Sequence, residues 1–212
     1  MYIHNESVTF EREVRSWDEL KDTNLVRQKY DYSCGAASLS SILSYYYGIS
    51  TSEKEILDSL LESKGIDVEQ KEIIEIDEEL RAKAHLSFLD LAHYAEQKGL
   101  RAMGLALDLE SLARLQAPVI IYVNVRDVEH FSVYKGIDEH YVYLADPSFG
   151  NIKVSISKFK EMFYQREDLS YPGKILAILP GSAEVEVNEA FMHKQDNTEF
   201  LYEIFKDRAV MP

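Results

Sequence analysis

The stretch Gln28-Lys-Tyr-Asp-Tyr-Ser-Cys-Gly-Ala-Ala37 contains the single cysteine of this 212-residue chain. It leads into apolar residues at the spacing of one helix face, namely Leu39, Ile42, Leu43 and Tyr46. Gly48 then offers the conformation with which helices commonly end. The sequence therefore predicts a helix that begins near Cys34 and ends before Gly48.

The position of Cys34 at a predicted helix start suits a nucleophile. The thiolate is the reactive form, and the partial positive charge of a helix N-terminus stabilises it. Gly35 and the alanines after it would leave room for a substrate backbone. Gln28 could offer its side-chain amide to an oxyanion, beside the backbone N–H of Cys34. Taken alone, however, a lone cysteine is more often a small buried apolar residue than a nucleophile, and Gln28 is equally a loop side chain that caps the helix.

A cysteine nucleophile needs a base, and the chain has six histidines. His130 opens a segment of alternating apolar residues that predicts a half-buried strand, His130 to Gly136. From there its ring could face the cysteine helix, although a strand-edge histidine without catalytic function fits the same pattern. The other five fall in the terminal segments, a turn, or on or beside a predicted helix, and surface or packing roles are expected for them: His4, His85, His93, His140 and His193.

Asp146 follows the next predicted strand, Tyr141 to Ala145. On adjacent antiparallel strands His130 and Asp146 would lie side by side, and the carboxylate would orient the imidazole and stabilise its charged form. The alternative interpretation of Asp146-Pro147 is ordinary turn chemistry. We expect the strand meander to end there.

The remaining pattern predicts an α+β fold, with helices first and clustered strands later. Ser52 and Ser87 are expected helix caps, each followed three residues later by an acidic residue. Further expected elements are a helix over 87–99, strands over 100–107, 118–125 and 174–179, and helices over 108–116 and 157–164. Residues 1–26 are expected to form a packing arm, 67–84 a solvated charged helix or insertion, and 181–212 a helical extension.

Composition limits the function classes. The net charge of −14 argues against nucleic acid or an anionic membrane as the partner. A single cysteine excludes an internal disulfide and any zinc site that needs two thiolates. The carboxylates of residues 67–79 lack the spacing of an oxygen-ligand loop, so no metal or other cofactor is expected. No apolar run approaches the roughly 20 residues that span a membrane, and Met1 to Glu6 lacks the pattern of a signal peptide.

Three motifs in this order resemble the peptidase C39 family. They are Gln-x5-Cys-Gly-x-Ala at Gln28–Ala37, His-Phe-x-Val-x-x-Gly at His130–Gly136, and Ala-Asp-Pro-x-x-Gly at Ala145–Gly150. The resemblance covers roughly residues 25–180, and implies a peptidase domain over 27–180. The family cleaves leader peptides after a Gly-Gly pair, usually from a domain attached to a bacteriocin-exporting transporter.

The resemblance implies a papain-like cysteine peptidase fold, with N-terminal helices including the cysteine helix packed on an antiparallel sheet. It implies Cys34 as nucleophile, His130 as base, Asp146 as its orienting acid and Gln28 in the oxyanion hole, and a peptide or protein substrate. Ser33 departs from the transporter-linked members, which have Asp before the cysteine. No transporter segment follows, so the chain resembles free-standing members, which often follow a signal peptide. This leaves the cell envelope and the cytoplasm both open.

Two other functions remain open on the sequence. One is a non-catalytic peptide-binding module, as in C39-like domains that have lost the cysteine. The other is an amidase or another acyl transferase, because water and amines attack the same thioester.

Overall fold

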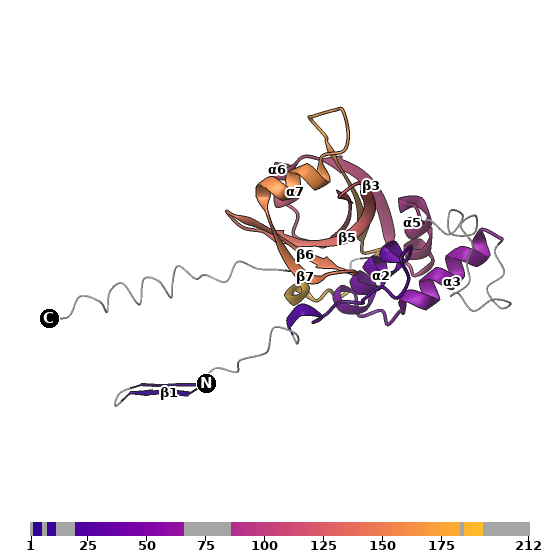
Figure 1. The fold of residues 1–212 in the computed structure, drawn as a ribbon. Coiled ribbons are helices and arrows are strands. Elements are labelled where there is room, and N and C mark those ends of the chain that lie inside the picture. The colour runs from indigo at the N-terminus through magenta and orange to yellow at the C-terminus, as the bar shows by residue number, and fades with distance from the viewer. Residues whose placement is uncertain (1, 6–7, 12–19, 66–85, 183–184, 193–212) are drawn as a thin grey trace.

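The protein's structure, a computed structural model, describes residues 2–5, 8–11, 20–65, 86–182 and 185–192. Its centre is a curved antiparallel sheet (Figure 1), with six strands among these residues in the order β3-β8-β4-β5-β6-β7. The strands are β3 (Arg101–Leu107), β4 (Val119–Val125), β5 (Val128–Ile137), β6 (Tyr141–Asp146), β7 (Gly150–Ser155) and β8 (Gly173–Leu179).

Helices cover both faces of this sheet (Figure 1). They are α2 (Cys34–Ser41), continued by a π-helical turn η1 (Ile42–Tyr46), α3 (Glu53–Ser63), α5 (Phe88–Gln97), α6 (Leu109–Ala113) and α7 (Ile156–Phe163), with a short 3-10 turn η3 (Glu189–Phe191). A separate hairpin pairs β1 (Tyr2–Asn5) with β2 (Val8–Glu11). The mixture of helices and antiparallel sheet is the α+β class expected from the sequence.

Strand alternation divides the core into two layers, because successive side chains point to opposite faces of a sheet. On β4, Ile120 packs towards α2, α3 and α5, whereas Ile121 packs towards α6 and α7. The first of these layers is closely packed around Gly35. A Cβ built at this position would lie 3.1 Å from the ring of Phe131 and 3.3 Å from Leu91. Gly35 therefore lets α2 approach β5 closely, which differs from the expected role of making room for substrate.

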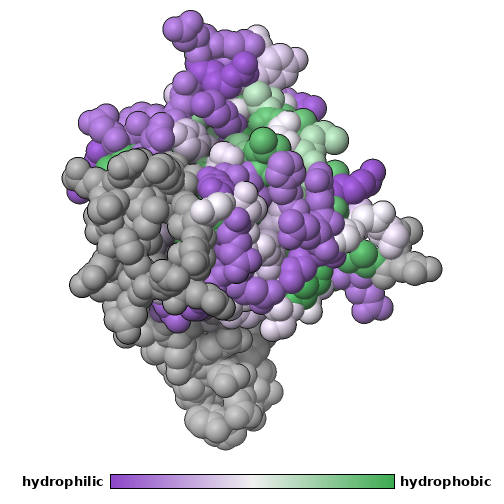
Figure 2. Space-filling view, turned by 90° about the vertical axis from the view of Figure 1, so that its right-hand side faces the viewer, coloured by the Kyte–Doolittle hydropathy of each residue, from purple (hydrophilic) through white to green (hydrophobic). Residues whose placement is uncertain are grey.

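Helix caps fall where the sequence predicts them. The hydroxyl of Ser52 accepts the N–H of Glu55 at 3.1 Å and begins α3. Ser87 and Asp90 form a reciprocal capping box at the start of α5. The exposed side chains of these helices are mostly polar or charged. The face on which α3 and α5 lie is mainly hydrophilic, with apolar side chains in small separate patches (Figure 2).

Three expectations differ from the structure or fall partly outside the described residues. The meander does not end at Asp146-Pro147, because the chain turns and returns along β6 as β7, with Asp146 opposite Gly150. The N-terminal segment includes a β-hairpin that the polar pattern did not predict, and residues 12–19 lie outside the described residues. Of the expected helical extension, residues 185–192 contain only η3, and 193–212 lie outside the described residues, as do 66–85.

No helix in the described parts of the chain is both long and apolar enough to cross a membrane.

Candidate active site

The fold brings together the side chains that the three motifs contribute. Cys34 is the first residue of α2, so its backbone and thiol lie at a helix N-terminus. His130 lies near the start of β5 and Asp146 ends β6, the neighbouring strand. Gln28 precedes α2, and its backbone N–H donates to the carbonyl of Pro147 at 3.0 Å. This bond ties the first motif to the third.

His130 and Asp146 form a buried pair. Nε2 of His130 lies 2.9 Å from Oδ2 of Asp146, and the two residues are 9% and 3% exposed. The pairing occupies Nε2 and leaves Nδ1 as the ring nitrogen free to serve Cys34, with which His130 also interacts. The imidazole therefore has a carboxylate on one nitrogen and a thiol beside it.

Two opposing effects set the pKa of His130. Burial lowers it, but the hydrogen bond to Asp146 and the contact with Cys34 outweigh burial and raise the pKa to about 9. An imidazole with this pKa is protonated at neutral pH. A protonated His130 can stabilise a neighbouring thiolate and can later donate a proton.

Asp146 is held as a carboxylate by its hydrogen bonds. Burial raises its pKa, but the bond and charge of His130, together with two backbone donors, outweigh burial and lower the pKa below its ordinary value. The donors are the N–H groups of Ser148 and Phe149, at 2.9 and 3.0 Å from Oδ1. With one oxygen on the turn and the other on His130, the carboxylate fixes the ring orientation.

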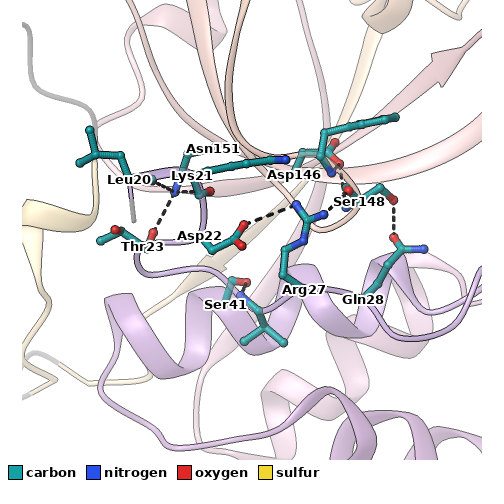
Figure 3. A network of polar contacts seen from close by, with 12 residues as sticks. Leu20, Lys21, Asp22, Thr23, Arg27, Gln28, Ser41, Asp146, Ser148 and Asn151 are labelled. Carbon is teal, nitrogen blue, oxygen red and sulfur yellow. Dashed lines mark hydrogen bonds and ion pairs between the residues drawn. The ribbon is translucent and has the colours of Figure 1, made fainter. Parts of the chain in front are cut away.

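Gln28 is oriented by contacts at both ends of its amide. Its Oε1 accepts the hydroxyl of Ser148 at 2.7 Å, and its Nε2 donates to the carbonyl of Tyr30 at 3.0 Å. An amide nitrogen carries two hydrogens, so one N–H remains for another acceptor. Figure 3 shows Ser148 between Gln28 and Asp146.

Arg27 and Asn151 connect the segment before α2 to the β6–β7 turn and to β7 (Figure 3). Arg27 donates from its guanidinium to the carbonyl of Ser148 at 2.6 Å. The amide of Asn151 on β7 donates to three carbonyls of the chain before the site, those of Leu20, Lys21 and Thr23, at 2.9 to 3.1 Å. The loop that carries Gln28 is thereby fixed to the sheet edge by side chains of both segments.

A buried carboxylate supports the loop just before Cys34. Glu53, at the start of α3, is 3% exposed, and its Oε1 accepts the backbone N–H of Lys29 at 2.9 Å. The same oxygen accepts the hydroxyl of Ser33, which is fully buried. Ser33 therefore uses its side chain to join the cysteine to α3, and does not cap α2.

Two cavities lie beside these residues, and Glu129 lines both of them. One of about 650 Å³ borders Gln28, His130, Ser148 and Phe149. The other, of about 260 Å³, is lined by Phe88, Tyr122 and Phe131 among others. Cavities of some 300–1,000 Å³ are typical of ligand sites, and together the two could accommodate an extended chain passing across the site.

The other histidines lie away from this arrangement or outside the described residues. His93 on α5 and His140 in the β5–β6 turn are exposed, as expected. The side chains of His4, His85 and His193 lie outside the described residues.

Sequence reasoning missed Ser148, Phe149, Arg27 and Glu53. The first two occupy the variable positions of the Ala-Asp-Pro-x-x-Gly motif, and Arg27 directly precedes Gln28, so their place in the chain was a signal. Glu53 gave none, because an acidic residue in the first turn of a helix is ordinary.

Comparison with known proteins finds relatives among peptidases. A model of the peptidase C39 family matches residues 71–166, a range that contains His130 and Asp146 and begins after Cys34. The chain is 32% identical over 148 residues to the probable functional amyloid protease FapD of Pseudomonas fluorescens, which covers 70% of this chain but 60% of that protein. An uncharacterized protein of Methanothermobacter thermautotrophicus is 31% identical, over 68% of this chain and 85% of its own.

Among solved structures, a double glycine motif protease from an AMS/PCAT transporter, in complex with the leader peptide, superposes with a TM-score of 0.52. The identity is 25%, and the match covers 74% of this chain and 90% of the other.

Proposed function

The chain belongs to the peptidase C39 family, and we propose that it is a cysteine peptidase whose nucleophile is Cys34. In this proposal His130 is the general base and acid, and Asp146 orients it. Gln28 and the backbone N–H of Cys34 receive the oxyanion. The peptidase domain extends over residues 27–180, with 1–26 as an arm and 181–212 as an extension.

The observation that carries the proposal is the buried His130–Asp146 pair beside the cysteine at a helix N-terminus. A structural histidine would be expected to remain neutral when buried, because burial disfavours the charged form. Here the carboxylate and the cysteine raise the pKa instead. Perturbed pKa values in a cleft are typical of catalytic groups.

The reaction follows from these groups. His130, whose pKa of about 9 keeps it protonated at neutral pH, holds the proton that Cys34 gives up, and the thiolate of Cys34 attacks the carbonyl carbon of the scissile bond. The oxyanion accepts hydrogen bonds from Gln28 and the Cys34 N–H. When the C–N bond breaks, His130 gives its proton to the leaving amine, and an acyl thioester remains. His130 then takes a proton from water, hydroxide attacks the thioester, and the C–S bond breaks to release the acid.

The substrate in this proposal is a peptide or protein cut after a Gly-Gly pair. One solved relative is a double glycine motif protease. The small cavity of about 260 Å³ lined by the aromatic side chains of Phe88, Tyr122 and Phe131 supports a narrow approach on the acyl side. Residues without side chains would pass such an approach most readily.

Thiol labelling tests the nucleophile. Iodoacetamide should label wild-type Cys34 rapidly well below pH 8.5, the ordinary thiol pKa, and slowly in His130→Ala. His93→Ala is the matched control, since this histidine is exposed on α5, and its labelling should equal wild type. Equal, slow labelling in all three proteins would refute an activated pair and favour a peptide-binding module.

Peptide cleavage tests the reaction itself. Wild type should cut a peptide that contains Gly-Gly, and Cys34→Ala and His130→Ala should not. Product masses with and without an added amine separate hydrolysis from acyl transfer. A dominant amide product would replace the peptidase by an acyl transferase that uses the same residues.

A further inference from the structure

The larger cavity beside His130, which we call the Phe149 cavity, is distinct from the space over Cys34. Its volume is about 650 Å³, more than twice that of the cavity near Phe88. Its lining residues are Gln28, Asp31, Val125, Arg126, Val128, Glu129, His130, Ser148, Phe149, Lys158 and Met162.

The chemistry of the site assigns this cavity to one side of the scissile bond. After attack the acyl part of the substrate is bonded to Cys34, whereas the leaving amine takes its proton from His130. Cys34 lines neither cavity, but His130, which gives its proton to the leaving amine, lines the larger cavity and not the smaller one. The larger cavity is therefore assigned to the leaving-group side. The smaller cavity, whose Phe131 packs against α2 at Gly35, lies on the acyl side.

The wall of the Phe149 cavity is apolar and exposed. Val128 is 63% exposed and Phe149 is 52% exposed, although both are apolar side chains beside a buried polar pair. Phe149 is held in place, because its N–H donates to Asp146 and its ring lies edge-on to that of His130, with 6.5 Å between centroids. Met162 on α7 completes this surface.

The charged residues that line the cavity do not favour a substrate side chain of either charge. Asp31 and Glu129 are acidic, whereas Arg126 and Lys158 are basic. Because their charges offset each other, discrimination between substrate side chains depends on contact with the apolar wall.

The backbone conformation of the turn between β4 and β5 also supports a functional role for this cavity. Arg126 and Asp127 both have positive φ, at 54° and 65°, which costs non-glycine residues free energy. Backbone strain of this kind clusters at functional sites. Here the strained turn places Val125 and Val128 on the cavity wall.

We propose that the Phe149 cavity binds the residues that follow the scissile bond and selects an apolar side chain among them. The inference rests on the proposed function, since it takes the leaving side from the reaction. It adds that the protein chooses its substrate on both sides of the bond.

A peptide series tests this on the full chain. Three fluorescein-labelled dodecapeptides contain Gly-Gly and differ only in the next residue, which is Leu, Ser or Asp. Wild type should cleave the Leu peptide with a kcat/KM about tenfold or more above the Asp peptide, with Ser between them. Val128→Ser and Met162→Ser should reduce this ratio to below about threefold. Met103→Ser, at an exposed methionine on β3 outside the cavity, should leave it unchanged.

Binding to Cys34→Ala separates the two proposals. Anisotropy should rank the three peptides in the same order without any cleavage, and Val128→Ser in the Cys34→Ala background should remove the ranking. If wild type cleaves all three peptides equally, the cavity assignment is wrong and the peptidase stands. If nothing is cleaved but the ranking persists and depends on Val128, the cavity binds an apolar side chain, whereas the peptidase and the assignment to the leaving side both fail. If neither cleavage nor ranking is seen, both fail.

Discussion

The hydroxyl of Ser148 donates to Oε1 of Gln28 at 2.7 Å, while the backbone N–H of the same serine donates to Asp146 at 2.9 Å (Figure 3). One residue therefore joins the amide proposed for the oxyanion hole to the carboxylate that orients His130. The two links differ in kind. A substitution at Ser148 removes the first and leaves the second, which is made by the backbone.

Ser148→Ala should lower kcat/KM for peptide cleavage about 10- to 100-fold, because the Gln28 amide loses a contact that fixes its orientation. The pH at which activity falls should not change, since the Asp146 link is retained. Ser148→Thr should restore most of the activity, and Ser170→Ala, in an exposed loop, should have no effect. An unchanged kcat/KM in Ser148→Ala would show that Gln28 needs no such support.

Gln28→Ala separates oxyanion stabilisation from thiol activation. Loss of one donor typically lowers kcat about 10²- to 10³-fold, and we expect this for peptide cleavage. Alkylation of Cys34 by iodoacetamide forms no oxyanion, so its rate should stay within about twofold of wild type. If cleavage and alkylation fell together, Gln28 would instead be supporting the structure around Cys34.

Asp146→Asn should shift the alkaline limit of activity. Burial lowers the pKa of His130, and Asp146 is first among the groups that raise it to about 9. Catalysis needs protonated His130, so activity is lost as pH rises through this pKa. Without the carboxylate the pKa falls, and the descending limb of kcat/KM should move from near pH 9 to lower pH by a unit or more. Asp168→Asn, an exposed carboxylate, is the control. A limb that stays in place would show that Asp146 does not set the proton affinity.

Glu53→Ala tests the support beneath the cysteine loop. The substitution leaves the Lys29 N–H without its acceptor and removes one of two acceptors of the Ser33 hydroxyl, which also donates to the carbonyl of Tyr30 at 2.8 Å. Loss of a partner for a buried polar group costs about 1–3 kcal/mol, so the free energy of unfolding in urea should fall by about that amount. Glu62→Ala on the same helix removes an exposed carboxylate and should change the free energy of unfolding by at most about 0.5 kcal/mol. If both variants lost the same free energy of unfolding, the buried contacts of Glu53 would make no particular contribution to stability.

Much of the proposed site could be predicted from the sequence because its residues lie in locally patterned segments. A helix of small residues after Cys34 and two apolar strands before and after Asp138 fix where Cys34, His130 and Asp146 must lie. Antiparallel pairing of the strands then brings His130 to Asp146, as the spacing predicted.

The missed features depend on contacts between distant segments. β7 was not predicted because Asp146-Pro147 indicated an ending, although Ile152 and Val154 alternate as a strand requires. Ser148 acquires its place only when the loop before α2 lies against the β6–β7 turn, 120 residues away in sequence. Glu53 faces Ser33 only once α3 packs beside α2.

The strained hairpin offers a last test, on stability. Type I′ turns favour Asn-Gly, because both central residues have positive φ, whereas this chain has Arg126-Asp127. Replacing the pair by Arg126→Asn and Asp127→Gly should raise the free energy of unfolding by about 1 kcal/mol. Gly48→Ala is the opposite control: its φ is 67° and nothing lies within 4 Å of the added Cβ, so strain alone should lower stability by about 1 kcal/mol. A double variant no more stable than wild type would show that Arg126 and Asp127 make compensating contacts. Their strain would then no longer support a functional reason for the turn beside the Phe149 cavity.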